Sequence, residues 1–423
     1  MAMEAEVKNS QVSLSNIKTA SFRLKAVVKE TPLTDSIRLN ERYDCKIMLK
    51  REDLQTVRSY KIRGAYNMIS QLDEEQQKSG VVCASAGNHA QGVAMSCSQL
   101  GIKAAIFMPE PTPGQKVNQV KMFGKDNVEL FLTGDTFDDA YKHARHYCDQ
   151  NNMTFIPPFD HKEIIEGQGT IGLEILQDSP EEIDYLLVPV GGGGLAAGIT
   201  TVFKTLSPKT KVIGVEPLGA PSLTKSIEEG EVVTLDKIDK FVDGAAVKQI
   251  GSLNFEILKD KIDRVITVPE GQICSTILNL YNDDAIIVEP AGALTVAALE
   301  QLKDEIKGKT VVAVISGSNN DITRTEEIKE RALLYEGLMH YFIVRFPQRA
   351  GALREFLTNV LGPGDDIVHF EYSKKNNREQ GPALVGLELK QASDFNGLLK
   401  RMDSYNITYE YLNEKQDLFQ YLI

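Results

Sequence analysis

The sequence predicts an α/β protein that carries a smaller α+β domain at its C-terminal end. Short apolar runs alternate with helical patterns as far as about residue 315, which is the order of parallel βαβ units. After a charged connector, from Glu326 to Glu336, the order becomes strand, helix, strand, strand, helix, strand. We therefore expect a domain at 1–330, with a smaller subdomain of roughly 60–155 inserted in it, and a second domain at 338–423.

Composition limits the classes of protein to consider. The 423 residues are 42% hydrophobic and 25% charged, which is ordinary for a globular chain with a large core. A formal net charge of −12 without a basic stripe argues against nucleic acid and anionic membranes as partners. The five cysteines form no CxxC pair, and the N-terminus has acidic residues where a signal peptide is basic. We expect a cytoplasmic protein with reduced cysteines, no metal and no membrane span.

The first candidate site residue is Lys61, in the stretch SYKIRGA from Ser59 to Ala65. It stands between an aromatic residue and a Gly-Ala pair that opens an apolar helical pattern. A lysine amine attacks an aldehyde only when it is held unprotonated, through desolvation or through a nearby cation such as Arg63. A lone lysine before a helix is more often an ordinary surface residue, so the later motifs must decide.

A second candidate is the turn SAGNHAQG, from Ser85 to Gly92, which follows the apolar strand pattern of Val81 to Ala84. In such a strand-to-helix turn the first backbone amides are free and lie at the positive end of the helix dipole. They suit a carboxylate. The competing interpretation is that Ser85 or Asn88 simply caps the helix.

The strongest local signal is the glycine run GGGGLAAG that follows the strand Tyr185 to Val190. Bare backbone N–H groups in such a loop can crowd around a phosphate. Gly191, Gly193 and Ala196 also fit a dinucleotide fingerprint, and Glu216 ends the next strand, where such folds place a ribose-binding acid. A nicotinamide-dependent oxidoreductase therefore stays open as an alternative.

Further along, three motifs remain ambiguous when they are taken alone. Glu289, in VEPAGA, either caps a helix or belongs to the site. The strand Thr310 to Ile315 ends in SGSN, from Ser316 to Asn319, where open α/β sheets bind ligands. The turn from Pro347 to Gly351 in the last domain is either a carboxylate site or a plain turn.

Taken together, these motifs resemble the fold-type II pyridoxal-phosphate enzymes, specifically the biosynthetic threonine dehydratases. The resemblance covers nearly the whole chain and implies two open α/β subdomains with a single C-terminal ACT-like (ferredoxin-like) regulatory domain. It implies pyridoxal 5'-phosphate as cofactor and deamination of L-threonine, or of L-serine, by α,β-elimination of water. It also implies a place at the first step of isoleucine biosynthesis, feedback by isoleucine, and a homotetramer. An amino-acid-sensing protein with an inert catalytic half is a third reading, which an intact Lys61 opposes.

The resemblance also implies roles for individual residues. Lys61 would bind the cofactor aldehyde and later act as the base on the substrate Cα, with Tyr60 beside the cofactor ring. Asn88 would hydrogen-bond the phenolic oxygen of the cofactor, and Ser85, with Asn88 and adjacent amides, would hold the substrate carboxylate. The residues expected to hold the phosphate are Gly191, Gly192, Gly193, Gly194 and Leu195.

Ser316 would face the pyridine nitrogen, and a neutral hydroxyl there gives a weaker electron sink than a carboxylate, which suits elimination better than transamination. Ala86 stands where serine racemases of this superfamily carry a second serine, so racemisation is disfavoured. Glu216 and Ala220 fit two ligands of a divalent cation that some relatives hold, but Ser222 replaces the aspartate. No metal is predicted.

Overall fold

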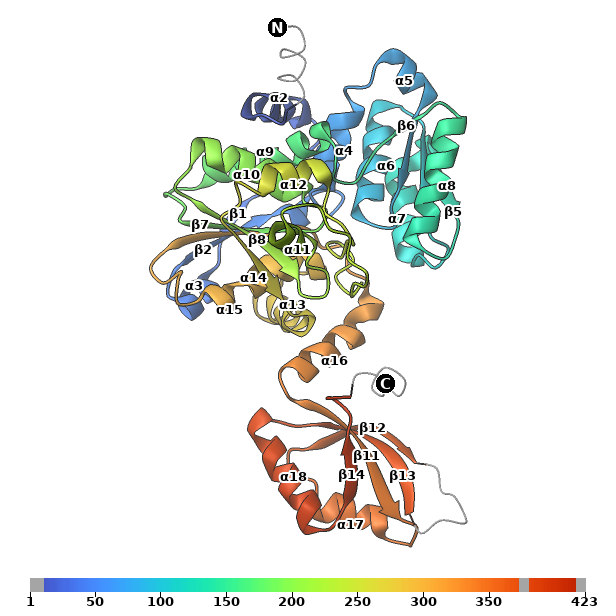
Figure 1. Cartoon of the computed structure of the whole chain (residues 1–423), viewed down its shortest axis with the longest axis vertical. Coiled ribbons are helices and arrows are strands. Elements are labelled where there is room, and N and C mark those ends of the chain that lie inside the picture. The colour runs from blue at the N-terminus through green and yellow to red at the C-terminus, as the bar shows by residue number, and fades with distance from the viewer. Residues whose placement is uncertain (1–10, 373–379, 416–423) are drawn as a thin grey trace. The chain divides into compact units, whose positions relative to one another are not determined.

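The computed structural model describes residues 11–372 and 380–415 (Figure 1). The chain forms two compact units, Met1–Ile322 and Thr323–Ile423. The stretch at 1–10, where the absence of a basic signal region was noted, lies outside the described residues, as does the end of the second expected domain at 416–423. Within the described ranges, no helix has both the length and the apolar character needed to cross a membrane.

The larger sheet of the first unit has six strands in the order β1-β2-β10-β7-β8-β9. All neighbouring strands are parallel except β1, which is antiparallel to β2. The strands are β1 (Leu33–Asp35), β2 (Lys46–Arg51), β7 (Tyr185–Pro189), β8 (Lys211–Pro217), β9 (Arg264–Val268) and β10 (Thr310–Ile315). The three-residue β1 was not predicted, because so short an edge strand has no periodicity to detect.

Helices cover both faces of this sheet, with α9, α10 and α12 on one side and α13 and α14 on the other (Figure 1). This double cover explains why the central strands are apolar on both faces. The helices of this part are α2 (Leu14–Leu24), α3 (Ile37–Tyr43), α9 (Lys162–Asp178), α10 (Gly194–Leu206), α11 (Ser222–Glu229), α12 (Ser252–Leu258), α13 (Glu270–Asp284), α14 (Pro290–Ala297) and α15 (Leu299–Leu302).

The smaller sheet of the first unit has four parallel strands in the order β5-β4-β3-β6. They are β3 (Val81–Ala84), β4 (Ala104–Met108), β5 (Val128–Leu132) and β6 (Thr154–Phe155), with α5 (Glu74–Ser79), α6 (Asn88–Leu100), α7 (Gly114–Gly124) and α8 (Phe137–Gln150) around them. The parallel βαβ order predicted from the sequence is thus present in both sheets.

Helix α4 (Lys61–Ile69) joins the two sheets, because it packs against α6 on one side and α9 on the other. Its approach to α9 is close: a Cβ atom at Gly167 would lie 2.5 Å from the carbonyl oxygen of Arg63 and 2.7 Å from Cα of Gly64. Glycine is required at this crossing for that reason. The first turn of α4, which begins at Lys61, is therefore fixed against the larger sheet's helices.

The second unit contains a four-stranded antiparallel sheet in the order β12-β13-β11-β14. Its elements are α16 (Thr325–Tyr335), β11 (Met339–Pro347), α17 (Ala352–Asn359), β12 (Asp366–Tyr372), β13 (Gln380–Glu388), α18 (Phe395–Ser404) and β14 (Thr408–Tyr411). A core that includes Phe342, Phe356 and Leu398 joins the sheet to α17 and α18. This is the split βαβ order predicted from the sequence.

Candidate active site

A cavity of about 690 Å³ opens in the first unit where strands of both sheets end. Its walls include the turn after β3, the glycine run after β7, the start of α4, Asn319 beyond β10, and a segment between 238 and 249. The carboxyl ends of parallel strands are where open α/β sheets bind ligands. The predicted site residues that line the cavity are Tyr60, Lys61, Ser85, Asn88, Gly191, Gly192, Gly193, Gly194 and Leu195.

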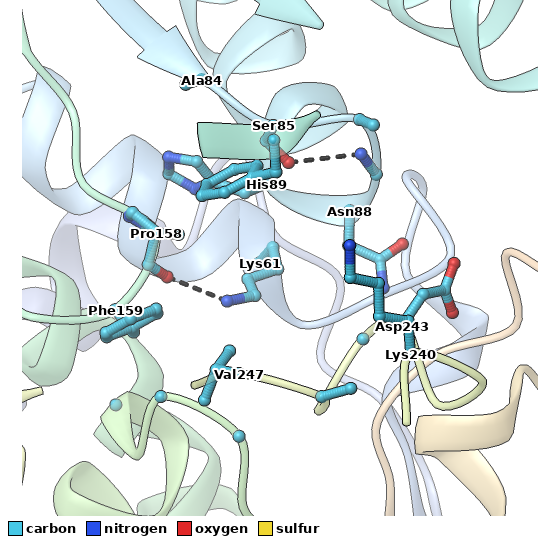
Figure 2. A pocket seen from close by; sticks show the side chains of 18 of the residues that line it. Lys61, Ala84, Ser85, Asn88, His89, Pro158, Phe159, Lys240, Asp243 and Val247 are labelled. Atoms are coloured by element: carbon cyan, nitrogen blue, oxygen red, sulfur yellow. Dashed lines mark hydrogen bonds between the residues drawn. The ribbon is translucent and has the colours of Figure 1, made fainter. Parts of the chain in front are cut away.

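The side chain of Lys61 points into this cavity, and its Nζ donates a hydrogen bond to the carbonyl oxygen of Pro158 at 2.9 Å (Figure 2). Burial lowers the pKa of Lys61 to about 8, and the charge of Glu289 opposes that shift. At neutral pH a far larger fraction of this amine is therefore unprotonated than in an exposed lysine. The aromatic ring of Tyr60 has its centroid 5.3 Å from Nζ.

Arg63 is not the cation that activates Lys61. Its guanidinium binds Glu52 at 2.8 Å and Glu174 at 2.5 Å, and its side chain is only 1% exposed. Desolvation, the other route that the sequence suggested, is the main cause of the lowered pKa of Lys61. Arg63 instead holds the first turn of α4 in place.

Ser316 is buried at the end of β10 but is not among the residues that line the cavity. Its carbonyl oxygen accepts a hydrogen bond from the backbone N–H of Tyr60 at 3.3 Å, and the backbone N–H of Ser318 donates to the carbonyl oxygen of Arg58 at 2.9 Å. The SGSN motif thus pairs with the segment immediately before Lys61. The role of the Ser316 hydroxyl stays a prediction.

The glycine run forms the turn into α10 and requires glycine at several positions. Gly193 has φ +91°, and a Cβ at Gly192 would lie 2.3 Å from the ring of Phe159. The first N–H groups of α10 have no acceptor within the helix and lie at its positive end, which suits a phosphate. The loop is held by Asn254, whose Nδ2 donates to the carbonyl oxygen of Gly192 at 2.7 Å.

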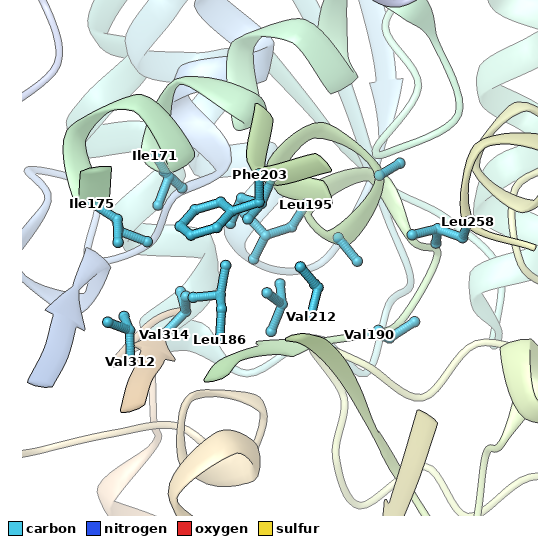
Figure 3. Close-up of a cluster of buried hydrophobic side chains, with 14 of the residues drawn as sticks. Ile171, Ile175, Leu186, Val190, Leu195, Phe203, Val212, Leu258, Val312 and Val314 are labelled. Carbon is cyan, nitrogen blue, oxygen red and sulfur yellow. The ribbon is translucent and has the colours of Figure 1, made fainter. Parts of the chain in front are cut away.

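Leu195 fixes the same loop from the other side. Its side chain points into the core cluster that lies between α10 and the larger sheet, near Phe203 and Val212 (Figure 3). The loop is therefore anchored by apolar packing on one face, and its backbone lines the cavity on the other. A loop held in this way would lose little conformational entropy if it bound an anion.

Glu289 is part of the cavity wall. The sequence allowed either a helix cap or a site residue at this position, and the structure favours the site residue. Its side chain makes no capping hydrogen bond to α14 and instead accepts one from Asn88 Nδ2 at 2.6 Å. Asn319 Nδ2 donates to the other end of the same carboxamide, at Asn88 Oδ1, over 2.6 Å. Burial, with the nearby charge of Asp243, raises the pKa of Glu289 to about 7.

The turn after β3 is closed by a local hydrogen bond, and its residues line the cavity. Ser85 Oγ accepts a hydrogen bond from the N–H of Gly87 at 3.2 Å, which closes a local turn before α6. Gly87 is the residue that precedes α6 and no side chain caps this helix, so the capping interpretation is wrong for both Ser85 and Asn88. His89 also lines the cavity, and burial lowers its pKa to about 3, which keeps it neutral. Its Nε2 is 2.9 Å from the carbonyl oxygen of Ile156, which can only accept a hydrogen bond, so Nε2 carries the hydrogen.

Two features of the site were missed by sequence reasoning. Lys116, on α7, forms a 2.6 Å ion pair with Asp243, so the small sheet's layer and the loop at 238–249 meet at the cavity. His89 is the other, although it lies inside a motif that was singled out. Neither residue has a local signal, because a charge on a helix or a lone histidine is ordinary in any sequence.

Glu216 lies outside the cavity wall. Its buried carboxylate accepts hydrogen bonds from the N–H groups of Leu223 at 2.7 Å and Thr224 at 2.9 Å, at the start of α11. A carboxylate held in this way is not placed to bind a ribose in the cavity. Among the described residues, no group of three or more His, Cys, Asp or Glu side chains is arranged to hold a metal ion.

A lysine of lowered pKa that shares a cavity with a glycine loop at a helix N-terminus is the arrangement expected in a pyridoxal-phosphate enzyme. A family model described as pyridoxal-phosphate dependent enzyme matches residues 24–317. A second model, described as the C-terminal regulatory domain of threonine dehydratase, matches residues 330–422. The chain belongs to the pyridoxal-phosphate dependent enzyme family, and it carries the threonine dehydratase regulatory domain.

Relatives agree over the whole length. The chain is 56% identical to the biosynthetic L-threonine dehydratase IlvA of Halalkalibacterium halodurans, over 98% of this chain and 100% of that protein. It is 57% identical to IlvA of Bacillus subtilis, over 98% of this chain and 99% of the relative. Among solved structures, threonine deaminase isoform 2 from Solanum lycopersicum is 40% identical, with a TM-score of 0.71, over 76% of this chain and 94% of that chain.

Proposed function

We propose that this chain deaminates L-threonine to 2-oxobutanoate and ammonia with pyridoxal 5'-phosphate, as the biosynthetic enzyme that begins the isoleucine pathway. The observation that carries the proposal is the juxtaposition of Lys61 and the glycine run in one cavity. Binding of a nicotinamide cofactor does not by itself explain a desolvated lysine beside the glycine run, and Glu216 is engaged elsewhere. Full-length likeness to biosynthetic threonine dehydratases supports the same activity.

The residues present fit the cofactor. The backbone amides of the glycine run would hold the phosphate of the cofactor, and Lys61 would bind its aldehyde carbon. Tyr60 would lie beside the cofactor ring. We keep Ser316 as the partner of the ring nitrogen. When bound, the cofactor supplies an electron sink for the negative charge that develops at the substrate Cα.

The protein's own contribution is to move one proton and to hold the substrate. Lys61 Nζ takes the proton from Cα, since desolvation lowers its pKa to about 8 and so makes the unprotonated amine far more populated near neutral pH than in an exposed lysine. Ser85 and the first amides of α6 would hold the substrate carboxylate. Pro158, Phe159 and Val247 give the cavity an apolar wall beside Lys61, which limits water there (Figure 2).

We further propose a division into a catalytic domain at 1–330, with a smaller subdomain at roughly 60–155, and a regulatory domain at 338–423. The second unit has its own core and its own sheet, as a separate regulatory domain needs. Isoleucine would inhibit through this domain, and valine would oppose it. A typical coupling of about 1–3 kcal/mol changes substrate affinity about 5–150-fold.

Communication between domains also favours a homo-oligomer, and we propose a homotetramer. The five unpaired cysteines support a reducing, cytoplasmic compartment. An assay of threonine and serine turnover, with and without isoleucine, tests substrate and effector together. Removal of the residues after Arg331 should leave an active enzyme that isoleucine no longer inhibits, and retained inhibition would place the effector site in the catalytic domain.

Lys61→Ala should abolish ammonia release from threonine, since it removes both the attachment point and the base. A matched control is Lys211→Ala. Lys211 also has its Nζ 5.3 Å from a tyrosine ring, that of Tyr185, but it is exposed and outside the cavity. Normal turnover by Lys61→Ala would contradict the assignment.

A further inference from the structure

A chain of side-chain amides crosses the first unit and ends at a carboxylate in the cavity. It begins at Gln119 on α7, whose Oε1 accepts from Gln91 Nε2 at 2.7 Å. Gln91 Oε1 in turn accepts from Asn319 Nδ2 at 3.0 Å, and the same Nδ2 donates to Asn88 Oδ1. Asn88 Nδ2 then donates to Glu289 Oε1 at 2.6 Å. The chain joins helices of the small sheet to loops of the large one.

Asn319 has a fixed orientation within this chain. Its Nδ2 lies 2.9 Å from the backbone carbonyl oxygen of Val57, which can only accept, and it also lies within hydrogen-bond distance of Asn88 Oδ1 and Gln91 Oε1. A flipped Asn319 carboxamide would place its oxygen against these three. Asn319 must therefore donate to Asn88, so the oxygen end of the Asn88 carboxamide faces Asn319.

The other end of Asn88 is fixed by Glu289. The oxygen end of Asn88 faces Asn319, so its NH₂ end faces Glu289, and the charged form of Glu289 can only accept a hydrogen bond from it. One of the two N–H groups of that end is used in this way. Within the part of the chain that the structure describes, the other has no partner, and Asn88 lines the cavity.

The space for the Glu289 carboxylate is built into the backbone. A Cβ at Gly317 would lie 2.5 Å from Glu289 Oε1, and one at Gly244 would lie 3.5 Å from the same atom. The side chain of Glu289 is buried between these two glycines. A larger residue at Gly317 would displace the carboxylate from Asn88.

We propose that Glu289 is a positioning residue for the reaction: together with Asn319 it fixes the Asn88 carboxamide with one N–H left to meet an oxygen of the bound cofactor. This inference rests on the proposed function, because that oxygen belongs to pyridoxal phosphate. Glu289 would affect cofactor binding only through the orientation of Asn88, since it does not contact the reacting atoms itself.

Glu289 also brings a proton equilibrium near pH 7 into the cavity. Burial is the main cause that raises its pKa to about 7, Asp243 raises it further, and the hydrogen bond from Asn88 and the charge of Lys116 lower it. The charged form of Glu289 in turn raises the pKa of Lys61 and of Tyr60. As the pH rises through about 7, Glu289 becomes charged and its bond from Asn88 becomes stronger.

The test uses the holoenzyme with Glu289→Gln and Glu289→Leu. Glutamine keeps an oxygen in the same place, whereas leucine keeps none. We expect the visible absorbance of the bound cofactor to change with a midpoint about pH 7 in the natural protein, and this transition to be lost in both variants. Cofactor affinity should stay within about twofold for Glu289→Gln and fall about tenfold or more for Glu289→Leu, since a hydrogen bond to Asn88 is lost.

Glu166 supplies the matched control. It is also buried, its pKa is also raised by burial, and it accepts a hydrogen bond from an asparagine, Asn16 Nδ2, at 2.8 Å, but it lies outside the cavity wall. Glu166→Gln and Glu166→Leu should keep the pH transition and the cofactor affinity, measured by fluorescence titration of the apo-protein.

Two results overturn the proposal. One is that the absorbance of the cofactor in Glu289→Gln still changes with the same pH midpoint as in the natural protein, and the other is that the glutamine and leucine variants bind the cofactor equally well. If Glu289→Leu does not fold, the pH transition of Glu289→Gln decides alone. Failure of the proposed function has a different signature, because the natural protein itself would then bind no pyridoxal phosphate and release no ammonia from threonine.

Discussion

Replacement of Arg63 by methionine tests how the fold holds Lys61, two residues earlier in α4. Arg63 is buried and makes paired hydrogen bonds to two carboxylates, Glu52 on the β2 side and Glu174 on α9. Methionine has a similar length and fills much of the same space. The substitution therefore removes the charge while it disturbs the packing little.

The expected loss of folding stability depends on which partners each carboxylate keeps in Arg63→Met. Glu174 retains Lys50 Nζ at 2.7 Å. Among the described residues, Glu52, which is 0% exposed, retains only the neutral donors Thr31 at 2.5 Å and Gln55 at 3.3 Å. One buried carboxylate is left without a counter-charge. Loss of one partner from a buried pair typically destabilises by about 3–5 kcal/mol.

Urea unfolding, followed by circular dichroism, measures this loss of folding stability. Fluorescence titration measures cofactor affinity, which should also fall because Lys61 is no longer held in position. Arg264→Met is the matched control, because Arg264 forms a 2.8 Å ion pair with Glu305 whose two side chains are 47% and 46% exposed. That change should cost less than about 1 kcal/mol. Equal costs for Arg63→Met and Arg264→Met would refute the bracing role of Arg63.

Two further predictions concern the cavity itself. In the apo-protein, Lys61 should react with an amine-selective reagent with a midpoint about pH 8, because burial lowers its pKa; a midpoint near its ordinary value of 10.5 would contradict this. Gly192→Ala should weaken cofactor binding about tenfold or more, since the added Cβ would meet the Phe159 ring at 2.3 Å. Gly114→Ala, where the structure puts nothing within 4 Å of the new Cβ, is its control, and similar affinities in the two variants would argue against the cradle.

The contiguous parts of the site could be read from the sequence. Where a strand is followed by four glycines and then a helix, the free backbone amides come from consecutive residues. Their arrangement can therefore be predicted from the local sequence. Lys61 could likewise be picked out, because it precedes an apolar helical pattern. The sequence left two possible causes for a lowered pKa of Lys61, desolvation and the charge of Arg63, and could not choose between them. The alternation of strands and helices in the first unit and the order of elements in the second were predicted for the same reason, since periodicity is local, whereas the short β1 was not.

The distant parts could not be read in this way. Asn88 and Glu289 are separated by 201 positions, and they meet only because both sheets direct their strand ends into one cavity. Lys116 and Asp243 meet across 127 positions. No local pattern marks such partners, and at Glu289 the sequence allowed both a cap and a site residue.

Reduction of the yellow holoenzyme with borohydride, followed by peptide mapping, tests most directly the claim that Lys61 carries the cofactor. The reduction fixes the cofactor to the amine that holds it, so its mass should appear on the peptide that contains Lys61 and on no other. A colourless protein that pyridoxal phosphate cannot reconstitute, or a cofactor fixed at another lysine, would contradict the claim.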